Sequence, residues 1–250
     1  MTRIIISGCN GKMGRQVFSC AADRDDCEVV AGIDISTETE NGYPIFSKPG
    51  EINVDADVII DFSNPALLPS LLQYAQINKM PLVLCTTGYS KAQIETIENV
   101  SKEVPVFYSG NMSIGVNLLI ELSKKAAKAL GNSFDIEIIE KHHNQKIDAP
   151  SGTALMIANS ISSVMNNNMH YVYDRHSQRK KRESTEIGIH SVRGGTIVGE
   201  HEVLFAGKNE TITITHTAQS KEIFAIGAVN AAIYLKNMPA GLYDMGDLLK

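Results

Sequence analysis

The residues best suited to chemistry lie together near the middle of the chain, in the segment EKHHNQKIDAPSGTA at positions 140–154. His142 and Lys146 are groups that enzymes use to give a proton to a reacting atom near neutral pH. Two adjacent histidines alone are usually ordinary polar surface residues. With a lysine and a Ser-Gly-Thr turn close behind, this segment instead predicts a site of general acid catalysis.

The second half of the segment predicts an anion-binding turn. Pro150 disfavours helix at the residue before it, so Ser151 is a natural N-cap for a helix that starts at Gly152. The free N–H groups of Gly152 and Thr153, together with two hydroxyls, would form a nest for a carboxylate. A metal site is not expected, because adjacent strand residues such as His142 and His143 point to opposite faces.

A second chemical signal lies near the N-terminus, where an apolar run leads into Gly8, Gly11 and Gly14 in a GxxGxxG pattern. Such glycines permit a tight turn, close approach of a pyrophosphate and close packing of helix on strand. Asp34 follows Gly14 by 20 residues, where a carboxylate can accept hydrogen bonds from ribose hydroxyls. We predict a dinucleotide site rather than a plain structural turn. Asp34 would repel a 2′-phosphate, so NADH should bind at least as well as NADPH.

Short β-branched runs alternate with helical patterns in the first half of the chain. The expected strands are 3–7, 28–33, 57–62, 82–85 and 104–108, and the expected helices are 12–22, 65–76 and 91–100. This alternation is typical of a parallel sheet covered on both faces.

The pattern changes after about residue 113. Further helices are expected at 116–130, 152–164 and 223–235, and strands at 134–140, 186–193, 199–205 and 210–216. Residues 241–249 are expected to form a short turn or helix. The predicted fold class is α/β, with an N-terminal Rossmann-type parallel sheet and a second α+β domain built on a mixed sheet.

Composition limits the function classes. A net charge of −5 argues against a nucleic-acid partner, and the apolar runs are too short for a membrane span. The four cysteines form no CxxC pair, and no signal peptide is evident, so a cytoplasmic location with reduced thiols is expected. The basic stretch within residues 165–185 is expected to be a solvated mobile loop rather than a phosphate-facing patch.

The segment at 140–154 closely resembles the signature of the dihydrodipicolinate reductase family. The resemblance extends over essentially the whole chain, through residues 8–14, 85–89, 109–117, 187–195 and 199–201. It implies reduction of 4-hydroxy-tetrahydrodipicolinate to tetrahydrodipicolinate by NADH or NADPH, with loss of water, in lysine and diaminopimelate biosynthesis. The substrate would thus be a small cyclic dicarboxylate.

The resemblance also implies roles for individual residues. The dinucleotide would be held by Gly8, Cys9, Asn10, Gly11, Lys12, Met13 and Asp34. The nicotinamide side would be lined by Cys85, Thr86, Thr87, Ser109, Gly110, Asn111 and Met112. The proton donors would be His142 and Lys146, and the substrate would be held by His143, Ser151, Gly152 and Thr153. Cys85 departs from the family pattern, in which we expect glycine.

Two domains and a homotetramer assembled through the second-domain sheet are further implications of the resemblance. The dinucleotide-binding domain would comprise residues 1–113 and about 221–250, and the substrate-binding and oligomerisation domain residues 114–220. Two alternatives remain at this point. Another two-domain amino-acid dehydrogenase would share the glycine turn but has no reason to carry the 140–154 segment. A non-catalytic NADH sensor would not need His142 and Lys146.

Overall fold

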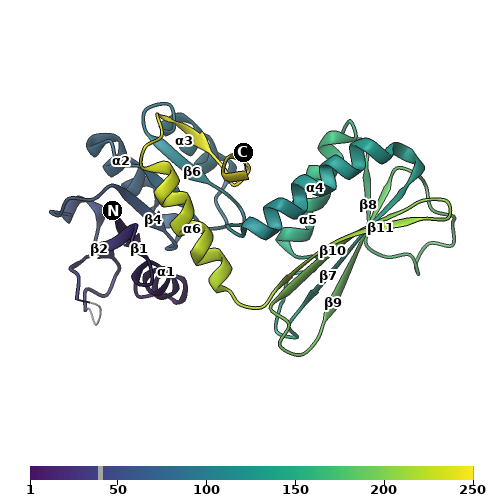
Figure 1. Cartoon of the computed structure of the whole chain (residues 1–250), viewed down its shortest axis with the longest axis horizontal. Coiled ribbons are helices and arrows are strands. Elements are labelled where there is room, and N and C mark those ends of the chain that lie inside the picture. The colour runs from purple at the N-terminus through teal and green to yellow at the C-terminus, as the bar shows by residue number, and fades with distance from the viewer. Residues whose placement is uncertain (39–41, 250) are drawn as a thin grey trace. The chain divides into compact units, whose positions relative to one another are not determined.

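The computed structural model describes residues 1–38 and 42–249. The chain divides into two compact units, one formed by Met1–Ile114 with Glu222–Lys250 and the other by Gly115–Lys221. Figure 1 shows the helices and strands of each unit. Among the described residues, no helix combines the length and apolar character that a membrane crossing requires.

The first unit is built on a seven-stranded sheet in the order β12-β6-β5-β4-β1-β2-β3, with every neighbouring pair parallel. Its strands are β1 (Thr2–Ser7), β2 (Cys27–Ile33), β3 (Ile45–Phe46), β4 (Val58–Asp61), β5 (Leu82–Leu84), β6 (Pro105–Tyr108) and β12 (Gly241–Tyr243). The strand order reverses between β1 and β4. In open parallel sheets, the crevice outside the carboxyl ends at such a reversal is where ligands bind.

Helices cover both faces of this sheet because its strands are apolar on both sides. Ile4 and Ile6 share a buried cluster with α1 (Lys12–Ala22) and α6 (Glu222–Leu235). Ile5 points to the other face and packs with α2 (Leu68–Asn78) and α3 (Lys91–Val100). Three short 3-10 helices, Pro49–Glu51, Pro65–Leu67 and Asp247–Leu249, complete the unit.

The second unit contains a five-stranded mixed sheet in the order β11-β10-β7-β9-β8. Its strands are β7 (Asp135–His142), β8 (His170–Val172), β9 (Glu186–Arg193), β10 (Gly199–Ala206) and β11 (Thr211–Ala218). Strand β10 pairs in antiparallel fashion with both β11 and β7. Strand β9 pairs in parallel fashion with both β7 and β8. The helices are α4 (Ile114–Leu130), α5 (Gly152–Val164) and the 3-10 turn Gly131–Ser133.

One face of this sheet packs against α4 and α5 through alternate strand residues. Ile136 and Ile138 of β7, Val203 and Phe205 of β10, and the apolar faces of both helices form a single buried cluster. Along β7, the same alternation continues beyond the apolar residues and places Glu140 and His142 on the covered face. The segment at residues 140–154 therefore begins inside the core of this unit.

The predicted fold class is confirmed: a parallel α/β sheet is combined with a second, mixed-sheet unit. The observed bounds of α1, α3, α5 and β9 equal those expected. The expectation for residues 241–249 was wrong in part, because Gly241–Tyr243 pairs with β6 as a parallel strand. The two short strands β3 and β8 were not anticipated either, since two or three residues carry no readable periodicity.

Candidate active site

The glycine turn after β1 brings backbone atoms closer together than side chains would permit. Gly8 has a φ of +78°, in the left-handed region that favours glycine. Its carbonyl oxygen accepts from the Gly11 N–H at 3.0 Å. A Cβ added at Gly14 would lie 2.2 Å from that same oxygen. The turn therefore needs glycine at both positions, as the sequence pattern predicted.

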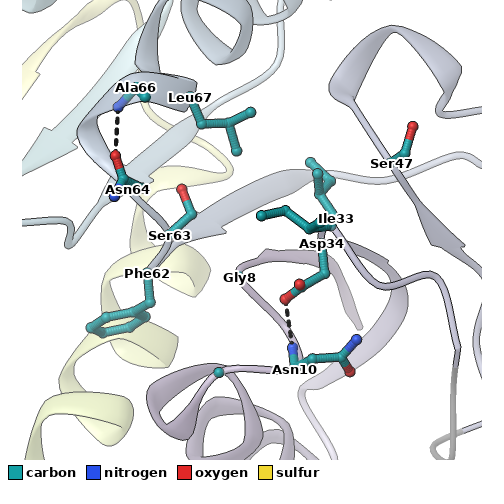
Figure 2. A pocket seen from close by; sticks show the side chains of 12 residues that line it. Gly8, Asn10, Ile33, Asp34, Ser47, Phe62, Ser63, Asn64, Ala66 and Leu67 are labelled. Atoms are coloured by element: carbon teal, nitrogen blue, oxygen red, sulfur yellow. Dashed lines mark hydrogen bonds between the residues drawn. The ribbon is translucent and has the colours of Figure 1, made fainter.

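The turn also leaves donors available for an anion. The N-cap of α1 is Gly11, and no side chain caps this end of the helix. Uncapped N–H groups at a helix N-terminus, with the positive end of the helix dipole, suit a phosphate. Asp34 follows β2, and its Oδ2 accepts from the backbone N–H of Asn10 at 2.9 Å, as Figure 2 shows. The carboxylate thus lies directly beside the glycine turn.

A pocket of about 770 Å³ opens at this point of the sheet, within the usual size range for small-molecule sites. Four of the predicted cofactor residues line it: Gly8, Asn10, Gly11 and Asp34. Sequence reasoning missed the rest of the lining: Ile33, Ile35, Ser47, Phe62, Ser63, Asn64, Ala66 and Leu67. Most of these residues follow β4, the strand next to β1 at the reversal of strand order. Because ligands bind at such a reversal, their place in the sequence just after β4 could have identified them.

Asp61, at the end of β4, organises the neighbouring loops and was also missed. Its side chain is fully buried and accepts from the Ser7 hydroxyl at 2.7 Å, the Ser63 hydroxyl at 2.5 Å and the Thr86 hydroxyl at 2.6 Å. The Tyr89 hydroxyl donates to it at 3.3 Å. One carboxylate thereby joins the ends of β1 and β4 to the segment after β5.

The other predicted cofactor residues lie outside the lining of this pocket. Cys9 and Cys85 are buried, and burial raises the pKa of both thiols, that of Cys9 to about 11. Lys12 and Thr87 are exposed, whereas Met13 is half-buried. The Ser109 hydroxyl donates to the Asn111 carbonyl at 2.9 Å. Of their neighbours, Gly110 is exposed and Met112 is buried.

In the second unit, His142 sits at the end of β7 with 8% of its surface exposed. Its Nδ1 lies 2.6 Å from Oε2 of Glu140, which is fully buried. Burial lowers the pKa of His142 below its ordinary value, and the bond to Glu140 opposes this shift only in part. The imidazole is therefore mostly neutral at neutral pH.

Ser151 is the N-cap of α5, as predicted. Its hydroxyl oxygen accepts from the Ala154 N–H at 3.1 Å, and its own N–H donates to Glu140 Oε1 at 3.1 Å. The same hydroxyl lies 3.0 Å from Nε2 of His201, whose pKa burial lowers to about 4. The N-terminus of α5, with Gly152 and Thr153, is thus fixed against both β7 and β10.

The loop between β7 and α5 is held by further contacts. The Lys146 ammonium pairs with the Asp148 carboxylate at 2.9 Å. The backbone carbonyl of His143, a half-buried residue, accepts from the Lys146 N–H at 3.1 Å. The carbonyl of His142 accepts from the Gly194 N–H at 2.9 Å, at the end of β9. These bonds place His142, Lys146 and the start of α5 in one ordered segment.

Arg193 and His201 complete this site, and sequence reasoning gave neither of them a role. Both belong to stretches, 187–195 and 199–201, whose resemblance to the family was noted, so the signal was present. Within residues 1–38 and 42–249, no three His, Cys, Asp or Glu side chains are grouped as a metal ion would require.

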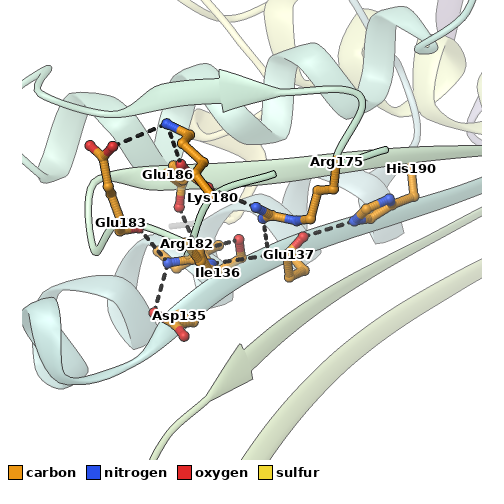
Figure 3. Close-up of polar contacts among 9 residues, drawn as sticks. All are labelled: Asp135, Ile136, Glu137, Arg175, Lys180, Arg182, Glu183, Glu186 and His190. Carbon is orange, nitrogen blue, oxygen red and sulfur yellow. Dashed lines mark hydrogen bonds and ion pairs between the residues drawn. The ribbon is translucent and has the colours of Figure 1, made fainter. Parts of the chain in front are cut away.

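The basic stretch is exposed from residue 173 to 181 and lies outside helices and strands, as expected of a solvated loop, but two of its arginines bind carboxylates. Arg175 pairs with Glu137 at 2.6 Å and with Glu186 at 2.7 Å. Arg182 pairs with Asp135 at 2.7 Å and with Glu137 at 3.1 Å, as Figure 3 shows. These arginines are engaged with carboxylates of β7 and β9, because the sheet offers an acidic strip that composition alone does not reveal.

Two family models match the chain. The model of the dihydrodipicolinate reductase N-terminus covers residues 2–112, and that of the C-terminus covers residues 115–249. Together they span nearly all of the sequence.

Individual relatives agree with these matches. The 4-hydroxy-tetrahydrodipicolinate reductase of Clostridium tetani is 51% identical over 249 residues, covering 100% of this chain and 97% of the relative. The enzyme of the same name from Caldanaerobacter subterraneus is 53% identical over 250 residues, covering 100% and 99%. A solved dipicolinate-bound dihydrodipicolinate reductase from Paenisporosarcina sp. TG-14 has a TM-score of 0.81 at 26% identity, covering 98% and 97%.

The close approach at the glycine turn gives a first prediction. Gly14→Ala should lower the free energy of unfolding by about 1–3 kcal/mol, because the new methyl group must displace the Gly8 carbonyl. It should also weaken NADH binding, measured by fluorescence titration. Gly50→Ala is the matched control, since a Cβ there meets nothing within 4 Å. Equal urea-unfolding curves for the two variants would contradict the prediction.

Proposed function

The chain belongs to the dihydrodipicolinate reductase family, and we propose that its two units divide the work of one enzyme between them. The activity is the NAD(P)H-dependent reduction of 4-hydroxy-tetrahydrodipicolinate, a step of lysine and diaminopimelate biosynthesis. In this proposal residues 1–113 with about 221–250 bind the dinucleotide. Residues 114–220 bind the substrate and form the contacts between subunits.

The glycine turn and its neighbours suit a dinucleotide, because a Cβ at Gly14 would fill the space that the turn requires and the α1 N-terminus has no side-chain cap. The residues that we assign to the cofactor are Gly8, Cys9, Asn10, Gly11, Lys12, Met13 and Asp34, and, on the nicotinamide side, Cys85, Thr86, Thr87, Ser109, Gly110, Asn111 and Met112. When bound, NAD(P)H supplies the hydride.

The substrate-binding residues of the proposal are His143, Ser151, Gly152 and Thr153. The N-terminus of α5 offers backbone N–H groups and a favourable helix dipole for a carboxylate. The Ser151 N-cap bond holds this terminus in place. Dipicolinate, the planar dicarboxylate named for the solved relative, is a fitting probe of this nest.

The chemistry explains why an acid is needed at this nest. Loss of water from the substrate gives a conjugated imine, and hydride addition at C4 pushes electrons through C3 toward the ring nitrogen. The resulting enamine must then take a proton at C3. His142 and Lys146 are the ionisable pair that we assign to this transfer. The observation that carries the assignment is their placement in one segment with the α5 N-terminus.

Replacing either residue tests the proposal. His142→Gln and Lys146→Ala should each lower kcat by about 10²–10⁴-fold, the usual contribution of a positioned acid. The NADH dissociation constant should hardly change, since neither residue belongs to the dinucleotide turn. Absorbance would follow NADH oxidation, with substrate made in place from aspartate semialdehyde and pyruvate. The control is Gln145→Ala, an exposed residue of the same loop. Near wild-type kcat in both variants would refute the assignment.

Cofactor preference follows from Asp34. Its carboxylate lies beside the glycine turn and would repel a 2′-phosphate, so KM for NADH should be equal to or lower than KM for NADPH. Asp34→Ser should move the ratio toward NADPH. A tenfold preference of the wild type for NADPH, about 1.4 kcal/mol, would show that a basic group elsewhere binds the phosphate.

We further propose a cytoplasmic homotetramer. All four cysteines are free thiols, which suits a reducing compartment. Edge strand β11 presents exposed threonines at 211, 213, 215 and 217, and an edge strand is a ready template for pairing with another chain. Sedimentation should give about four times the chain mass of 27.2 kDa, and Thr213→Lys with Thr215→Lys should lower it. A monomeric wild type would contradict this assembly.

A further inference from the structure

Two glutamates of β7 hold similar clusters on opposite faces of the sheet. Glu137 binds Nε2 of His190 at 2.8 Å and the guanidinium groups of Arg175 and Arg182 (Figure 3). Glu140, three residues on, binds His142 and Arg193 on the face that α5 covers. Of the two clusters, the one around Glu140 includes a residue of the proposed proton-transfer pair.

Every oxygen of Glu140 is occupied by donors. Oε1 accepts from Nη2 of Arg193 at 2.7 Å and from the Ser151 N–H at 3.1 Å. Oε2 accepts from Nη1 of Arg193 at 2.7 Å and lies 2.6 Å from Nδ1 of His142. Burial alone would favour the neutral acid, but these hydrogen bonds outweigh it and lower the pKa of Glu140 to about 2. The carboxylate is therefore ionised at every pH at which the enzyme would work.

An ionised carboxylate can only accept hydrogen bonds, so the proton at this contact must belong to Nδ1 of His142. A neutral imidazole carries one N–H, which leaves Nε2 without a proton. Nε2 is then the ring nitrogen at which His142 takes up a proton, and only the protonated ring can pass that proton to the substrate from the same atom. The same logic governs the carboxylate–histidine pair of serine proteases, in which the acid sets the tautomer and orientation of the base.

We propose that Glu140, held by Arg193, is a positioning residue of the reductase that fixes the Nδ1–H tautomer and ring orientation of His142. This inference rests on the proposed proton-transfer role of His142. Arg193 gives the pair a second function, because its Nη2 also donates to the Asp148 carbonyl at 2.6 Å. The same guanidinium thus ties the loop that contains Lys146 to the strand that holds His142.

Glu140→Gln is the decisive substitution. We expect kcat to fall by about 10–10²-fold, less than on loss of the acid itself, with little change in the NADH dissociation constant. The titratable and charged groups that face His142 are Glu140 on β7, Arg193 on β9, the mostly neutral His201 on β10 and Lys146 in the following loop. Of these, only Glu140 raises the pKa of His142. Its neutralisation should therefore move the His142-dependent inflection of the kcat/KM profile to lower pH.

Two further variants separate positioning from structure. Glu137→Gln breaks the matched His–Arg–Glu cluster on the other face and should leave kcat and the inflection unchanged. Glu140→Gln also leaves the half-buried Arg193 without its counter-ion, which can prevent folding. The double variant Glu140→Gln with Arg193→Gln removes both charges. It should regain thermal stability and keep the catalytic defect and the shifted inflection.

Three results would overturn the inference. One is a wild-type kcat and inflection in Glu140→Gln or, if that variant does not fold, in the double variant. Another is recovery of kcat together with stability in the double variant. A third is a full additional loss when Glu140→Gln is placed in a His142→Gln background, where a residue acting through His142 has nothing left to position. Wild-type kcat in both His142→Gln and Lys146→Ala would instead refute the proton-transfer assignment itself.

Discussion

The burial of one carboxylate, that of Glu140, determines how the second unit is arranged around its active segment. An unpaired charge in such a place costs several kcal/mol, so donors must meet it from every side. They come from β7 itself, from Arg193 on β9 and from the first turn of α5. This requirement fixes the register in which His142 lies opposite Arg193, and it fixes the residue at which α5 begins. A one-residue slip of β7 would carry Glu140 to the opposite face of the sheet and leave Arg193 and the Ser151 N–H without this acceptor.

The first unit buries a carboxylate by different means. Asp61 is fully buried, and its partners are hydroxyls of Ser7, Ser63 and Thr86 rather than a cation. These partners follow or end three neighbouring strands at the carboxyl edge of the sheet, where the pocket opens. Asp61 therefore meets only neutral hydroxyl donors among these partners, whereas Glu140 is paired with the Arg193 guanidinium beside His142. Each arrangement thus satisfies a buried acid with donors from the strands and loops around it.

Much of this could be predicted from sequence, because the informative signals are local. The alternation of β-branched strands with helices predicted the parallel sheet, and the Gly8–Gly14 spacing predicted a turn that only glycines allow. The contact of Arg193 with Glu140 could not be predicted, since it joins residues 53 positions apart through sheet register. The pairing of Arg175 and Arg182 with Glu137 could not be predicted either. Composition shows that these arginines are charged, but it does not show which strand supplies the carboxylates that neutralise them. Strand β12 was not predicted, because its three residues form a strand only by pairing with the neighbouring strand β6.

The charge states of the second site explain why it holds two kinds of proton-bearing group. Burial lowers the pKa values of His142 and His201, so both rings are mostly neutral near pH 7. The Lys146 ammonium, paired with the exposed Asp148, brings a positive charge to the same segment. If His142 were also cationic, it would repel Lys146 and Arg193 at close range. A neutral ring, oriented by Glu140, instead has a bare Nε2, which in the proposed mechanism takes up a proton before passing it on. Proton transfer can then proceed without accumulation of like charge.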